Sequence, residues 1–99
     1  MKIAVDLDDT YTKDPRRFDS IIGQLKSAGH EVGVITCRRQ AQVAWADFLF
    51  CGNLAGLDIP PQIEYKTKIM KENNIALLFD DMARHYSDEV IVVDILEKI

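Results

Sequence analysis

Ile3-Ala4-Val5-Asp6-Leu7-Asp8-Asp9-Thr10 is the stretch that decides the fold, because an apolar strand runs directly into a group of acidic residues. Asp6 and Asp8 are two residues apart, and Thr10 follows at the same spacing. Ionised carboxylates are costly to bring together unless a cation neutralises them. Carboxylates at the end of a buried strand therefore indicate a metal site, a catalytic site or both.

The composition is that of one ordinary globular domain. The chain has 99 residues, 47% of them hydrophobic and 28% charged, which leaves no room for a second core. A net charge of −4 does not indicate a nucleic-acid-binding surface. No apolar run is long enough for a membrane span, and the N-terminus lacks the pattern of a signal peptide. Cys37 and Cys51 lack CxxC spacing, so we expect reduced thiols in a cytoplasmic protein.

Apolar runs typical of buried parallel strands alternate with segments of helical periodicity. Asp14-Pro15 predicts the start of the first helix and Gly29 its end. This alternation predicts an α/β fold, a three-layer doubly wound Rossmann-like arrangement around a five-stranded parallel sheet, with residues 1–99 in one domain. The expected strands cover residues 2–6, 31–36, 62–65, 75–79 and 90–93, and the two further helices cover residues 39–50 and 67–73.

Three of the predicted strands end in a polar residue that can do chemistry. These residues are Asp6, Thr36 and Asp80, and Asp81 follows Asp80 directly. In doubly wound sheets, ligands bind at the carboxyl ends of the strands. We therefore expect these side chains to lie at one edge of the sheet.

The order of these residues resembles that of the haloacid dehalogenase (HAD) superfamily of phosphohydrolases. The first motif of that family is Asp-x-Asp-x-Thr/Val, which stands here as Asp6-Leu7-Asp8-Asp9-Thr10, with Asp9 where Gly is often found. The resemblance covers most of the chain. The second motif is a Thr or Ser at the end of the second strand, here Thr36 in Val34-Ile35-Thr36. The third is a Lys at a helix start, here Lys66 in Tyr65-Lys66-Thr67-Lys68. The fourth is an acidic pair at the end of the fourth strand, here Asp80 and Asp81 in Phe79-Asp80-Asp81.

The resemblance implies a Mg²⁺-dependent phosphatase. Asp6 would be the nucleophile that forms an aspartyl-phosphate, and Asp8 the general acid and base. Thr36 and Lys66 would neutralise the phosphoryl oxygens. Lys68 is an alternative for this role. We prefer Lys66, because Lys66 precedes the expected helix start and its distance from Asp80 along the chain suits a short helix and a strand. The implied Mg²⁺ ligands are Asp6, Asp80, Asp81 and, through its backbone carbonyl, Asp8.

Several residues close in sequence to these motifs allow two interpretations. Asp81 is either a metal neighbour or the N-cap of a turn at residues 82–85. Arg38 and Arg39 either meet a substrate phosphate or begin a solvated helix face. His85 either lines the site or lies on the surface.

Residues 37–64 have room for a helix and a loop but not for a cap domain, so the chain resembles a capless member of the family. An uncapped site admits a large phosphorylated substrate, such as a phosphorylated polymer end, or is covered by another subunit. Apolar residues in the tail, Ile95, Leu96 and Ile99, would cover the sheet or a partner, and a homodimer is one such assembly.

Two other functions remain open from the sequence. The first is a HAD-like interaction protein that binds metal or phosphate without turnover. The second is a receiver-like signalling module. The phosphoacceptor Asp of the receiver family ends the third strand, whereas the third predicted strand here ends at Tyr65-Lys66.

Overall fold

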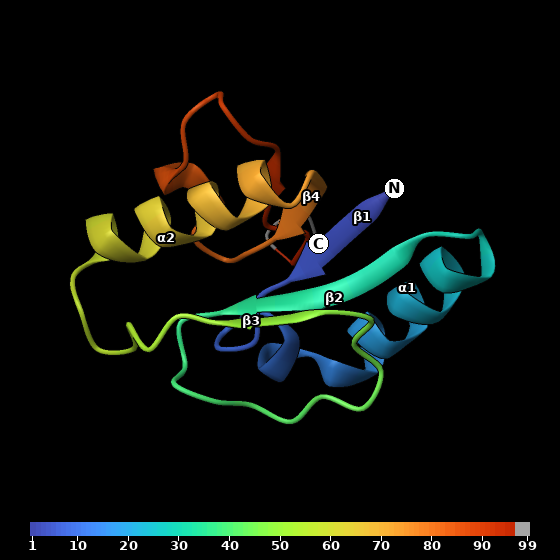
Figure 1. The fold of residues 1–99 in the computed structure, drawn as a ribbon. Coiled ribbons are helices and arrows are strands. Elements are labelled where there is room, and N and C mark those ends of the chain that lie inside the picture. The colour runs from blue at the N-terminus through green and yellow to red at the C-terminus, as the bar shows by residue number, and fades with distance from the viewer. Residues whose placement is uncertain (97–99) are drawn as a thin grey trace.

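The strands form one parallel sheet with the order β3-β2-β1-β4-β5 (Figure 1). The computed structural model describes residues 1–96. An α/β fold with a five-stranded parallel sheet, compatible with a Rossmann-like fold, is therefore confirmed for the described residues. The strands are β1 (Lys2–Val5), β2 (Glu31–Thr36), β3 (Leu49–Cys51), β4 (Ile75–Phe79) and β5 (Val92–Val93); the helices are α1 (Pro15–Ser27), α2 (Ile59–Glu72) and the short 3₁₀ helices η1 (Tyr11–Lys13) and η2 (Ala83–His85).

Strand β1 lies at the centre of the sheet, and the side chains on both of its faces are apolar and buried. Ile3, Ala4 and Val5 are at most 2% exposed. β1 pairs with β2 on one side and with β4 on the other. The predictions for these three strands are correct to within one residue, since near-continuous apolar runs are typical of strands buried on both faces.

The two long helices pack against different core clusters. Phe18 and Ile22 of α1 lie with Ile3 and Val5 of β1 in one cluster. Ala4 of β1 belongs to the other cluster, which also contains Met70 of α2. Because successive side chains of a strand point to opposite faces, β1 contributes to both clusters.

Helix α1 begins and ends where the sequence predicts. The Asp14 carboxylate accepts a hydrogen bond from the Arg17 backbone N–H at 3.3 Å, and Pro15 opens the helix. Gly29 follows the helix with φ +94°, a left-handed conformation that glycine adopts without steric cost.

The predicted helix over residues 39–50 is wrong. The segment is irregular up to Phe48 and then forms the edge strand β3. The Val34 N–H donates to the Phe48 carbonyl at 2.9 Å, and the Val32 N–H donates to the Asp47 carboxylate at 2.9 Å. Phe48 and Phe50 pack against the same cluster at a spacing of two, the period of a strand.

The predicted strand at residues 62–65 is also wrong, because it and the helix expected over 67–73 belong to one helix, α2. Pro60 and Pro61 lie in the first turn, where a backbone N–H has no intrahelical acceptor and proline is tolerated. The prolines therefore help to start this helix.

Gly33 makes a contact that no larger residue can make. A Cβ atom at this position would lie 2.4 Å from the Phe48 carbonyl oxygen and 2.5 Å from its ring. We expect Gly33→Ala to lower the free energy of unfolding by about 2 kcal/mol, because β3 must move away from β2. Urea denaturation measures this loss. Gly23→Ala is the control: a Cβ there meets nothing within 4 Å, so equal losses in the two variants would contradict the packing argument.

The end of the described chain covers the sheet. Ile95 and Leu96 pack against the cluster that contains Phe18, in agreement with the prediction for the tail, and Ile99 lies outside the described residues. The predicted strand at residues 90–93 is shorter than expected, since β5 holds only Val92 and Val93. Among residues 1–96, no helix has the length and apolar character of a membrane span.

Candidate functional site

Three carboxylates meet where β1 and β4 end. Asp6 follows β1, and Asp80 and Asp81 follow β4. The strands are paired up to Val5 and Phe79, and the Asp6 N–H donates to the Phe79 carbonyl at 2.9 Å. One oxygen from each of the three side chains lies within 4.8 Å of the others. The parallel pairing of two strands thus brings together acidic groups from opposite ends of the chain.

Lys66 joins two of these carboxylates. Its ammonium Nζ lies 2.8 Å from Asp6 Oδ1 and 2.9 Å from Asp80 Oδ2, and the residue is 5% exposed. Lys68 points away, with 69% of its side chain exposed, and is 3.9 Å from Glu72. The preference for Lys66 agrees with this placement. The expectation that Lys66 precedes a helix is wrong, because it lies in the middle of α2.

Thr10 and Tyr86, for which the sequence indicates no role of their own, hold the carboxylates in place. The Thr10 hydroxyl bridges the two strand ends: it lies 3.2 Å from Asp6 Oδ2 and 3.1 Å from Asp81 Oδ1, and accepts the Asp81 N–H at 2.9 Å. The Tyr86 hydroxyl donates to Asp80 Oδ2 at 2.8 Å. Thr10 belongs to the first motif, whereas nothing in the spacing of Tyr86 points to this contact.

The burial of these charges changes their protonation. Burial raises the pKa of Asp6 to about 7, although the Lys66 ammonium opposes the rise. Burial, together with the Asp80 carboxylate, also raises the pKa of Asp81. Burial disfavours the charged form of Lys66, but Asp6 and Asp80 outweigh it and raise the pKa of the ammonium. Lys66 therefore stays cationic beside Asp6, a carboxylate whose raised pKa disfavours its ionised form.

The charges of this group fit a divalent cation. Three carboxylates and one ammonium leave a charge of −2 when all are ionised. The donors are all oxygen atoms, which Mg²⁺ prefers. Asp6, Asp80 and Asp81 are the residues that would hold the ion. Its positive charge would oppose both the burial and the carboxylate repulsion that raise the pKa of Asp6 and Asp81.

Asp8 and Thr36 do not join the carboxylate group through their side chains. The Asp8 side chain is 56% exposed, and its carboxylate accepts hydrogen bonds from Arg38 Nη2 at 2.6 Å and from Arg38 Nε at 3.0 Å. The hydrogen bonds from Arg38 lower the pKa of Asp8. Thr36 is fully buried, and its hydroxyl accepts the Arg38 backbone N–H at 3.1 Å. Arg38 is thus the residue that links the ends of β1 and β2.

The contacts decide between the two interpretations of Asp81. Asp81 faces Thr10, and the Met82 N–H is bound by Asp80 Oδ1 at 3.0 Å, so Asp81 is not the cap of the turn. Asp9 adopts φ +58°, a left-handed conformation that Asp tolerates better than most residues.

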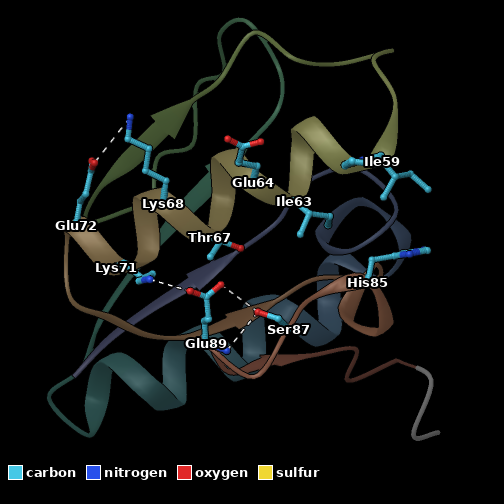
Figure 2. A pocket seen from close by; sticks show the side chains of 11 residues that line it. Ile59, Ile63, Glu64, Thr67, Lys68, Lys71, Glu72, His85, Ser87 and Glu89 are labelled. Carbon is cyan, nitrogen blue, oxygen red and sulfur yellow. Dashed lines mark hydrogen bonds and ion pairs between the residues drawn. The ribbon is translucent and has the colours of Figure 1, made fainter.

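His85 is exposed and lines a groove of about 720 Å³ beside α2. Figure 2 shows His85 near Ile59 at one end of this groove and the Lys71–Glu89 pair toward the other. None of the four residues Asp6, Lys66, Asp80 and Asp81 lines the groove. Arg39 is exposed.

No family model, curated protein or solved structure matches this chain. The functional argument therefore rests on the residues and their geometry.

Proposed function

We propose that the protein is a Mg²⁺-dependent phosphohydrolase that acts through an aspartyl-phosphate on Asp6. In this proposal residues 1–99 form a capless, three-layer HAD-like domain. The observation that carries it is the position of Lys66, a buried ammonium between Asp6 and Asp80 at the carboxyl ends of two adjacent strands. A cation and carboxylates at this edge are what phosphoryl transfer requires.

In the proposed reaction, an oxygen of Asp6 attacks phosphorus as the bond to the leaving oxygen breaks. Asp8 gives a proton to the leaving oxygen and later removes one from the water that hydrolyses the aspartyl-phosphate. Lys66 and Thr10 hold the two oxygens of Asp6 in place. Thr36 accepts the backbone N–H of Arg38, whose guanidinium binds Asp8, and its hydroxyl would donate to the phosphoryl group. A bound Mg²⁺ would neutralise phosphoryl charge.

Phosphate release from a panel of monoesters tests the proposal. The panel contains an aryl phosphate, nucleotides, sugar phosphates and phosphorylated oligonucleotides, each with Mg²⁺ or with EDTA. We expect release in Mg²⁺ and none in EDTA. Since the ion would bind only the folded chain, we also expect the melting temperature to rise by about 10 °C at a hundredfold excess over Kd. Release that persists unchanged in EDTA would contradict the metal requirement.

One observation favours a second function, a protein that binds metal or phosphate without turnover. Arg38 occupies both oxygens of the Asp8 carboxylate, the group that should move protons. Stabilisation by Mg²⁺ without hydrolysis of any ester in the panel would favour this function. The receiver-like module is disfavoured, because the sheet order 3-2-1-4-5 differs from the 2-1-3-4-5 order of receiver domains.

A further inference from the structure

A second cavity is lined by Arg38, the residue that binds the Asp8 carboxylate. It has a volume of about 320 Å³ and is bordered by the chain that follows β1 and the chain that follows β2. Leu7, Tyr11 and Trp45 give it apolar and aromatic walls, and Arg38 and Gln42 add polar groups. Apolar walls with a few polar groups, in a volume above about 300 Å³, are typical of small-molecule sites.

The aromatic part of this cavity is held in position. The ring centroids of Tyr11 and Trp45 lie 5.5 Å apart with an interplanar angle of 42°. The Tyr11 hydroxyl donates to Asp19 at 2.6 Å, and the Trp45 carbonyl accepts a hydrogen bond from Lys26. Both rings are half-buried, so each packs on the core and still borders the cavity.

Arg38 connects the cavity to the proposed chemistry. Arg38 lines the cavity, and its guanidinium binds both oxygens of Asp8. In the proposed reaction Asp8 serves the leaving oxygen, so the leaving group must lie near Asp8 and its partner Arg38. The carboxylate group lines neither this cavity nor the larger groove beside α2. The groove is a weaker candidate because Arg38, the residue that binds Asp8, does not line it, and because two of its lysines pair with its own glutamates.

We propose that this cavity binds a planar aromatic ring in the leaving group of the substrate, so that the substrates are nucleoside monophosphates or aryl phosphates. This inference rests on the proposed phosphohydrolase function. Tyr11 and Trp45 offer ring surfaces for stacking, the Arg38 guanidinium can stack on the ring, and the Gln42 amide can donate to and accept from a ring edge.

The single Trp of the chain makes the test direct, because Trp45 alone supplies the tryptophan fluorescence. The leaving groups themselves, adenosine, uridine and phenol, are titrated into the Asp6→Asn variant, with ribose and glycerol as non-aromatic controls. We expect saturable quenching by the nucleosides or by phenol and none by the controls. The two aromatic arms distinguish a nucleoside from an aryl source. A folded protein whose fluorescence responds to none of them overturns the inference.

A second measurement uses activity. We expect Trp45→Leu to lower kcat/KM for the aromatic phosphate by about tenfold or more, and to leave kcat/KM for glycerol phosphate within about twofold. An equal loss for both substrates overturns the inference. Quenching by an aromatic leaving group without any phosphate release supports the aromatic site and contradicts the proposed function. Phosphate release without aromatic preference or quenching contradicts only the aromatic site.

Discussion

We expect Asp6→Asn to reduce Mg²⁺-dependent phosphate release at least about 1000-fold while the protein stays folded. The amide cannot attack phosphorus as a carboxylate does. It can still turn its carbonyl toward Lys66 and its N–H₂ toward the Thr10 hydroxyl, the two groups that hold Asp6 now. It also removes one of three neighbouring negative charges. The loss of activity should therefore come without a loss of stability.

The measurement compares phosphate release with thermal melting in the same preparations. Asp88→Asn is the matched control, because it makes the same chemical change at an exposed position. Its activity and melting temperature should equal those of the wild type. Release by Asp6→Asn within about tenfold of the wild type would contradict Asp6 as the nucleophile.

The pairing of the two acidic strand ends could be predicted from the sequence for a simple physical reason. The runs that become β1 and β4 are apolar and end in Asp6 and in Asp80-Asp81. Parallel strands have their carboxyl ends at one edge, so the acids meet whenever the two strands are neighbours. The structure has this neighbour relation, and the side chains lie within 4.8 Å.

The segment from residue 39 to residue 50 could not be predicted in the same way. Ala41, Ala44, Trp45 and Phe48 have helical spacing, which predicts a helix that the structure does not contain. What decides the conformation is contact with β2, where Gly33 leaves room for the Phe48 carbonyl and ring. Such long-range contacts leave no periodic signal in the segment itself.

The supporting residues of the site show the same limit. Thr10 reaches Asp81 from 71 residues away, and Arg38 reaches Asp8 from 30 residues away. Their partners follow from the strand order, which no local pattern contains. The sequence therefore indicates the charged residues of the site by their type, but not the contacts that the Thr10 and Tyr86 hydroxyls and the Arg38 guanidinium make with them.

The role of Lys66 in stability is as testable as its role in catalysis. We expect Lys66→Met to lower the free energy of unfolding of the metal-free protein by about 3 kcal/mol or more. Met keeps much of the volume and the helix propensity of Lys, but it leaves Asp6 and Asp80 without the ammonium that lies between them. Because both carboxylates are buried, water cannot replace that charge.

The matched control is Lys68→Met, two residues along the same helix. Lys68 is exposed and its pairing with Glu72 is long, so we expect a change within about 0.5 kcal/mol. Thermal melting of both variants with and without Mg²⁺ separates two effects. A cation bound by the three remaining carboxylates should restore part of the stability of Lys66→Met and leave the Mg²⁺ response of Lys68→Met equal to that of the wild type. If both variants unfold at the wild-type temperature in EDTA, Lys66 does not provide the charge that allows the acidic strand ends to lie together.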